Sequence, residues 1–60
     1  MKIEDCNVGN LVIMWCVGWD TWDDEVLKVV DTFGLTVKLE SKSGRTQEVY
    51  HGAQCKVVSF

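Results

Sequence analysis

The clearest pattern in the chain is an alternation of apolar and polar residues over residues 35–40. In this stretch, LTVKLE, the apolar residues occupy every second position, which is the period of a strand with one buried face. The preceding stretch EVLKVVDTF (25–33) is rich in β-branched and aromatic residues. It predicts a second strand that places Leu27, Val29 and Phe33 on one face, with a glycine turn between the two strands.

Three further strands are predicted around this pair. Residues 45–50 (RTQEVY) follow the polar loop SKSG as a third strand of a meander, and the apolar run LVIMWCV (11–17) is a largely buried first strand. The segment HGAQ (51–54) predicts a single short helical turn before a last strand over residues 55–60. No stretch shows a 3.6-residue apolar repeat over ten or more residues. The sequence therefore predicts an all-β fold of five strands.

The alternation also predicts the core. Apolar residues on the inward face of each strand should be buried together, and Trp15 should join them because large aromatic side chains dominate small cores. The strand residues that we expect in the core are Leu11, Ile13, Val29, Leu35, Val37, Leu39, Val49 and Val57.

The order of these elements resembles a known class of small domains. The stretch VGNLVIMW, the meander over residues 25–50 and the connector HGAQ before CKVVSF are similar to the Src-homology-3-like barrel in its Tudor and KOW variants. The resemblance covers the chain from about Asp5 to Phe60. It implies a single domain over residues 1–60, built as a strongly bent five-stranded sheet that binds through the loops around one end. The sequence lacks the tyrosine-rich and proline-bearing motifs of the polyproline-binding members.

Charge narrows the class of partner. The 60-residue chain has nine acidic and six basic residues, a net charge of −3. Residues 1–30 hold two lysines against six acids, whereas residues 31–60 hold four bases against three acids. Phosphate backbones are bound by clustered Lys and Arg, and here the bases are few and dispersed. A protein partner with a basic surface is therefore expected in preference to nucleic acid.

The location of the protein is also constrained by the sequence. The start MKIEDC lacks the features of a secretory signal, and the longest apolar run of seven residues is too short to span a bilayer as a helix. We expect a cytoplasmic protein without a membrane anchor. Its small size and acidity resemble those of bacteriophage accessory proteins that bind host machinery, which would place it in the host cytoplasm.

The segment GWDTWDDE (18–25) is the strongest candidate binding surface. It sets two tryptophans among four carboxylates with no basic residue beside them, in what we expect to be the longest loop of the barrel. An aromatic face beside a carboxylate suits an Arg or Lys side chain, and tryptophan is over-represented among binding hot spots. The predicted partner-binding residues are Trp19, Asp20, Trp22, Asp23, Asp24 and Glu25.

Alternatives remain open. Either tryptophan of this segment could fold back to cap the barrel, or Trp19, Trp22 and Tyr50 could contribute to a Tudor-type cage for methylated Lys or Arg. The second class of function is a KOW-type module that binds nucleic acid or ribonucleoprotein. Such a module would use the bases near the distal hairpin, which are Lys38, Lys42 and Arg45.

The three cysteines do not predict a disulfide framework. In a cytoplasmic chain, Cys6, Cys16 and Cys55 should be reduced and buried as small apolar residues. With His51 they could supply four soft ligands, but nine residues separate the first two cysteines, unlike the close spacing of zinc knuckles. We therefore expect no metal and no cofactor.

Catalytic motifs are equally scarce. His51 and Cys55 are the residue types of a thiolate nucleophile and its base, but a 60-residue barrel has little volume for a substrate pocket. The sequence contains no Gly-rich phosphate loop, nucleophile elbow or metalloprotease motif. We expect a protein that is not an enzyme.

Overall fold

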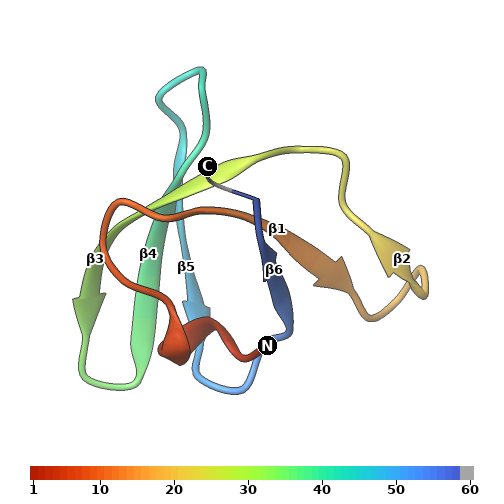
Figure 1. Cartoon of the computed structure of the whole chain (residues 1–60), viewed down its shortest axis with the longest axis horizontal. Helices are drawn as coiled ribbons and strands as arrows, with labels where there is room; N and C mark the ends of the chain where they lie inside the picture. Colours follow the sequence, from red (N-terminus) through yellow and green to blue (C-terminus); the bar gives the residue numbers. More distant parts are fainter. Residues whose placement is uncertain (59–60) are drawn as a thin grey trace.

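The computed structural model describes residues 1–58, which form a curled antiparallel half-barrel (Figure 1). The order of strands in the sheet is β2-β1-β3-β4-β5, and β6, which lies outside this order, also pairs with β1. This arrangement confirms the predicted all-β fold and is compatible with an Src-homology-3-like barrel. The elements in chain order are the 3-10 helix η1 (Ile3–Asp5) and the strands β1 (Leu11–Cys16), β2 (Thr21–Trp22), β3 (Leu27–Phe33), β4 (Thr36–Glu40), β5 (Thr46–Tyr50) and β6 (Cys55–Val57).

Strand β4 is the centre of the β3-β4-β5 meander, and its alternation is confirmed. Val37 and Leu39 are fully buried, and they pair across the sheet with Val49 and Val29. Val29 is also fully buried, and Val49 packs against the core. The polar residues of β4 lie on the opposite face because successive side chains of a strand alternate.

A β-bulge in β3 reverses the direction of the residues that follow it. Val29 pairs with Leu39, but the next pair is Asp31 with Lys38, so Val30 is the extra residue of the bulged strand. As a result, Phe33 pairs with Thr36 on the outer face and is exposed. The prediction that Phe33 shares a face with Leu27 and Val29 is therefore wrong, because the bulge inverts the pleat between them.

Strand β1 has the inward face opposite to the predicted one. Val12 and Met14 are buried, whereas Leu11 is exposed and Ile13 is partly buried. Every residue of this strand is apolar, so its sequence does not distinguish the two faces. The pairing of Val12 with the buried Leu27 decides between them.

Two other predicted core residues lie at the ends of strands. Leu35 belongs to the two-residue turn between Phe33 and Thr36, where Gly34 has a φ of 53° and the side chain of Leu35 is 73% exposed. Val57 is exposed at the end of β6. The predicted last strand continues to Phe60, and its final two residues lie outside the described part of the chain.

The N-terminal segment completes the core, which the strand pattern did not predict. Ile3 in η1 is fully buried, and Cys6 is buried immediately after it. The Ile3 amide donates to the Ala53 carbonyl at 2.8 Å, and Cys55 donates to the Met1 carbonyl at 2.8 Å. These bonds fasten the start of the chain beside β6.

The connection between β5 and β6 is a turn and not a helix. The Ala53 amide donates to the Tyr50 carbonyl at 3.4 Å, and Gly52 has a φ of 96°. Within residues 1–58, the one helical turn is η1, which lies near this turn at the same end of the sheet (Figure 1). The Gly52 amide donates to Glu4 Oε1 at 2.7 Å, and this bond lowers the pKa of Glu4.

Candidate functional site

The predicted binding segment forms a short β-hairpin and not a long loop. Strands β1 and β2 pair at Trp15 with Trp22 and at Cys16 with Thr21, and residues 17–20 connect them. The connection is closed by a hydrogen bond from the Trp19 amide to the Cys16 carbonyl at 3.1 Å. Asp20 adopts a φ of 52°, a left-handed conformation that Asp tolerates better than most residues. The hairpin projects from the side of the sheet in Figure 1.

The tip of this hairpin exposes two apolar side chains. Val17 and Trp19 are each 85% exposed, and Asp20 beside them is also exposed. A single exposed apolar residue is ordinary on a protein surface. Here an exposed valine and an exposed tryptophan lie two positions apart on a four-residue connection, and an exposed carboxylate follows the tryptophan in the chain. We call residues 17–20 the hairpin tip.

Trp22 packs against another aromatic ring, whereas Trp19 is exposed to solvent. Its ring lies 5.0 Å from that of Trp15 with an interplanar angle of 76°, the edge-to-face arrangement that aromatic pairs prefer. Lys56 Nζ lies 4.6 Å from the centroid of the Trp22 ring, within the range of a cation–π interaction. Trp22 is half-buried, as is Trp15. Trp22 therefore packs against Trp15 of β1, but neither ring belongs to the buried core cluster, so Trp22 does not cap the core.

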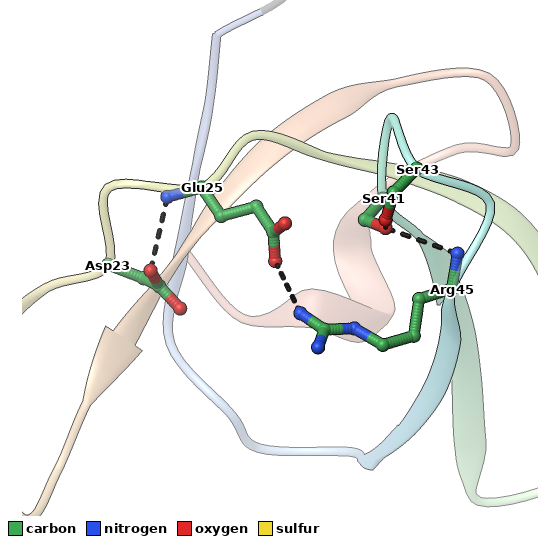
Figure 2. A network of polar contacts seen from close by, with 5 residues as sticks. All are labelled: Asp23, Glu25, Ser41, Ser43 and Arg45. Atoms are coloured by element: carbon green, nitrogen blue, oxygen red, sulfur yellow. Dashed lines mark hydrogen bonds and ion pairs between the residues drawn. The ribbon is translucent and has the colours of Figure 1, made fainter.

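The acidic residues of the segment also differ in their environments. Some contact other residues of the fold, and others are exposed to solvent. Asp23 is half-buried, its amide donates to the Met14 carbonyl at 2.8 Å, and its Oδ1 accepts from the Glu25 amide at 3.1 Å. Glu25 Oε1 lies 3.6 Å from Arg45 Nη2, and Figure 2 shows how these two side chains face each other. The interpretation that no basic residue answers these carboxylates is therefore wrong for Glu25, because the fold brings Arg45 to it from the β4–β5 connection.

Asp24 is exposed at the base of the hairpin. Of the six predicted residues, three are therefore accessible to a partner: Asp24 and two residues of the hairpin tip. The other three hold the hairpin and its base in place. The accessible predicted residues are Trp19, Asp20 and Asp24, and the structural ones are Trp22, Asp23 and Glu25.

The alternative function, nucleic-acid binding, would depend on three basic residues. Two of them, Lys38 and Arg45, lie beside acidic residues. Lys38 pairs across the sheet with Asp31 on one side and with Glu48 on the other, and Arg45 contacts Glu25. Lys42 is exposed in the β4–β5 connection, where Ser41 Oγ accepts from the Arg45 amide at 3.2 Å and lies 2.8 Å from Ser43 Oγ (Figure 2).

Sequence reasoning missed a groove beside this connection. It has a volume of about 220 Å³ and combines apolar walls with two lysines. Its lining residues are Leu11, Val26, Lys28, Glu40, Ser41 and Lys42. These residues come from three separate strands or their ends, and no local sequence motif joins them.

An exposed apolar group at the end of the meander was also missed. Phe33 and Tyr50 flank Thr36 in one cross-strand row on the outer face, and Leu35 lies in the adjacent turn. All three apolar side chains are exposed. The Thr36 hydroxyl donates to Glu48 Oε2 at 3.1 Å or to the Phe33 carbonyl at the same distance. The bulge in β3 is the reason that Phe33 joins this face.

The three cysteines are free thiols, but the prediction that all of them are buried is wrong for Cys16, which is only partly buried. Cys6 and Cys55 are buried, and their sulfur atoms lie 3.5 Å apart. Burial, and to a smaller extent the contact with the Cys6 thiol, raise the pKa of Cys55 to about 12. A thiol with such a high pKa is a poor nucleophile. His51 is exposed in the β5–β6 turn, so the environment of Cys55 does not favour a catalytic pair.

The four residues considered above as zinc ligands do not come together. Cys16 is partly buried next to the hairpin tip, whereas Cys6 and Cys55 lie in the core. Over the described residues 1–58, no three His, Cys, Asp or Glu side chains come together as a metal-binding group.

Comparison with known proteins gives no relative. No family model matches the chain, and neither a curated protein nor a solved structure matches it. In the part of the chain that the structure describes, no helix has the length and apolarity needed to cross a membrane.

Proposed function

We propose that this chain is a non-enzymatic protein-interaction module that binds a basic protein surface through the tip of the β1–β2 hairpin. The observation that carries this proposal is Trp19, which is 85% exposed on a tight connection beside Val17 and Asp20. Tryptophan is enriched among the residues that dominate interface energies. Short connections on a rigid sheet are also common positions for binding residues.

The chemistry of the tip favours an Arg or Lys side chain in the partner. A guanidinium or ammonium group can lie over the Trp19 indole while Asp20 contacts its charge. The Lys56–Trp22 pair, with 4.6 Å between nitrogen and ring centroid, is an example of the same contact within the chain. Exposed carboxylates at Asp20 and Asp24 would also steer a basic partner toward the hairpin and speed its association.

The finer family assignment belongs to the same proposal. The half-barrel is compatible with a Tudor or KOW variant of the Src-homology-3-like class, acting in the cytoplasm, and the size and acidity of the chain support a bacteriophage accessory protein that binds host machinery. A cage for a methylated residue is not part of the proposal. Trp22 already contacts Lys56, and its strand β2 lies at the opposite end of the strand order from β5, which carries Tyr50.

Trp19→Ala tests the proposal, with Leu35→Ala as the matched control. Both side chains are exposed apolar groups on turns, but they lie on different connections. Affinity purification from the source cells followed by quantitative mass spectrometry should recover one partner with wild-type protein and with Leu35→Ala, and lose it with Trp19→Ala. With the isolated partner, Trp19→Ala should speed dissociation at least tenfold, because removal of an anchor acts mainly on dissociation.

Changes of charge then test the electrostatic part. Asp20→Asn combined with Asp24→Lys should slow association with the partner and change its salt dependence while the fold survives, since both side chains are exposed and Asn tolerates the left-handed backbone at residue 20. Unchanged binding by Trp19→Ala and by this double variant would refute the proposal. Binding of single-stranded RNA that falls steeply with salt would instead support the alternative nucleic-acid module around Lys38, Lys42 and Arg45.

A further inference from the structure

A sulfur cluster lies between the N-terminal segment and strand β6. Cys6 Sγ is 3.5 Å from Cys55 Sγ and 3.7 Å from Met1 Sδ. Cys6 follows η1, and Cys55 is the first residue of β6. The cluster therefore joins positions that are 49 residues apart in the chain.

Backbone hydrogen bonds hold the three residues together. The Cys55 amide donates to the Met1 carbonyl at 2.8 Å, and Lys2 forms a β-bridge with Gln54. The Cys6 amide donates to the Ile3 carbonyl at 3.1 Å, which closes η1 and directs the chain back over the core. The sulfur ligands are thus positioned by main-chain contacts that do not depend on a bound ion.

The spacing of the sulfur atoms suits a metal ion. With metal–sulfur bonds of about 2.3 Å, the sulfur ligands of a tetrahedral or trigonal site lie about 3.8–4.0 Å apart. The two measured separations, 3.5 and 3.7 Å, need to open by only a few tenths of an ångström. A disulfide needs the Cys6 and Cys55 sulfurs to approach to about 2.05 Å, which is a larger displacement inside a packed core.

The ligand types select a soft ion. Thiolate and thioether sulfur favour Cu(I), whereas Zn(II) sites are built from Cys, His and carboxylates. One of the three groups here is a thioether. Over residues 1–58, no three His, Cys, Asp or Glu side chains come together as an alternative metal site. We propose that Met1, Cys6 and Cys55 form a binding site for one Cu(I) ion. This proposal departs from the expectation of no bound metal, which rests on the unsuitable spacing of Cys6, Cys16, His51 and Cys55 for zinc.

One side of the sulfur cluster is buried in the core, and the other side is exposed to solvent. Cys55 is 1% exposed and Cys6 is 7% exposed, whereas Met1 is 64% exposed. An ion can therefore enter along the Met1 side chain and reach the two thiols. Binding releases the two thiol protons to solvent, so that a Cu(I) ion and two thiols give a bis-thiolate complex with the thioether as third ligand.

Cu(I) titration of the full chain under anaerobic, reducing conditions tests the site. In competition with the chromogenic chelator bicinchoninate, the wild-type chain should retain one copper per chain. Cys16→Ser is the matched control and should retain the same amount, because Cys16 lies outside the cluster. Cys6→Ser and Cys55→Ser should each weaken retention at least a hundredfold.

A second measurement does not depend on the folding of a variant. X-ray absorption at the copper edge of the wild-type complex should show three sulfur neighbours at about 2.3 Å. Two sulfur neighbours only, a loss of copper in Cys16→Ser equal to that in Cys6→Ser, or no retention by the wild-type chain would each overturn the proposal. Stoichiometric retention of Zn(II) in the presence of equimolar Cu(I) would overturn the selectivity for a soft monovalent ion.

Discussion

At the scale of single residues, two leucines four positions apart in the chain have opposite environments. Leu39 is fully buried in β4, whereas Leu35 lies in the turn before that strand. Both fit the same apolar-polar alternation in the sequence. The alternation predicts which face of a strand a residue shares, but the point at which the strand begins decides whether the residue meets the core.

This pair supports a direct test of burial. Leu39→Ala should lower the free energy of unfolding by about 2–5 kcal/mol, because it loses apolar burial and leaves a cavity. Leu35→Ala removes the same atoms, but from a side chain that is exposed to solvent. It should change the free energy of unfolding by less than about 0.5 kcal/mol. Urea denaturation of both variants gives the comparison. Equal losses would contradict the placement of Leu35 in the turn.

Tryptophan environments could not be separated from sequence either. Trp19 and Trp22 both lie among acidic residues, and only the pairing of β1 with β2 places Trp22 against Trp15. In the same way, Arg45 lies 20 positions from Glu25 in the chain, and their contact depends on the fold. The sequence therefore defines a candidate segment, but it does not predict which of its residues the fold leaves exposed.

At the scale of elements, the β1–β2 hairpin depends on its aromatic pair. Trp22→Ala removes the edge-to-face contact with Trp15 and the ring beneath Lys56, and it should cost about 1–3 kcal/mol of stability. Trp19→Ala, at the exposed tip, should cost less than about 0.5 kcal/mol. Thermal unfolding and near-ultraviolet circular dichroism check both values, and a larger loss for Trp19→Ala would show that the tip is structural.

The turn between β3 and β4 offers a second test at this scale. Gly34 has a φ of 53°, and a Cβ there would meet no atom within 4 Å. The cost of Gly34→Ala should therefore come from the backbone alone, at about 1–2 kcal/mol. Gly18 has the same open surroundings without a positive φ, so Gly18→Ala should be neutral or stabilising by up to about 1 kcal/mol. Equal effects in chemical denaturation would contradict this explanation.

Much of the element order was predictable, and the exceptions have physical causes. The β3-β4-β5 meander follows from alternation and turn glycines, as predicted. The bulge at Val30 and the inward face of β1 were not predictable. In a run of consecutive apolar residues, either face of the strand could be the buried one. Strand β2 has two residues, too few for any period to be seen.

At the scale of the whole molecule, the half-barrel is closed by a segment without strand periodicity. Ile3 is the largest of the fully buried side chains, and it lies in a 3-10 turn whose neighbours are bonded to residues 53–55. Short chains bury a smaller fraction of their surface than long chains do, so one such residue is a large part of the core. The stability of the entire domain should therefore depend on its first few residues.

Ile3→Ala tests this dependence, and Ile13→Ala is the matched control because both substitutions remove the same atoms. Ile3→Ala should cost about 2–5 kcal/mol, since its side chain is fully buried, and Ile13→Ala should cost less because Ile13 is only partly buried. In hydrogen exchange, the Cys55 amide, which donates to the Met1 carbonyl, should lose protection in Ile3→Ala together with the amides of β4. If the Cys55 amide alone lost protection, the N-terminal segment would be a separate unit that opens without unfolding the barrel. Loss of protection at both places, by the same free energy, would show that the segment and the sheet unfold as one.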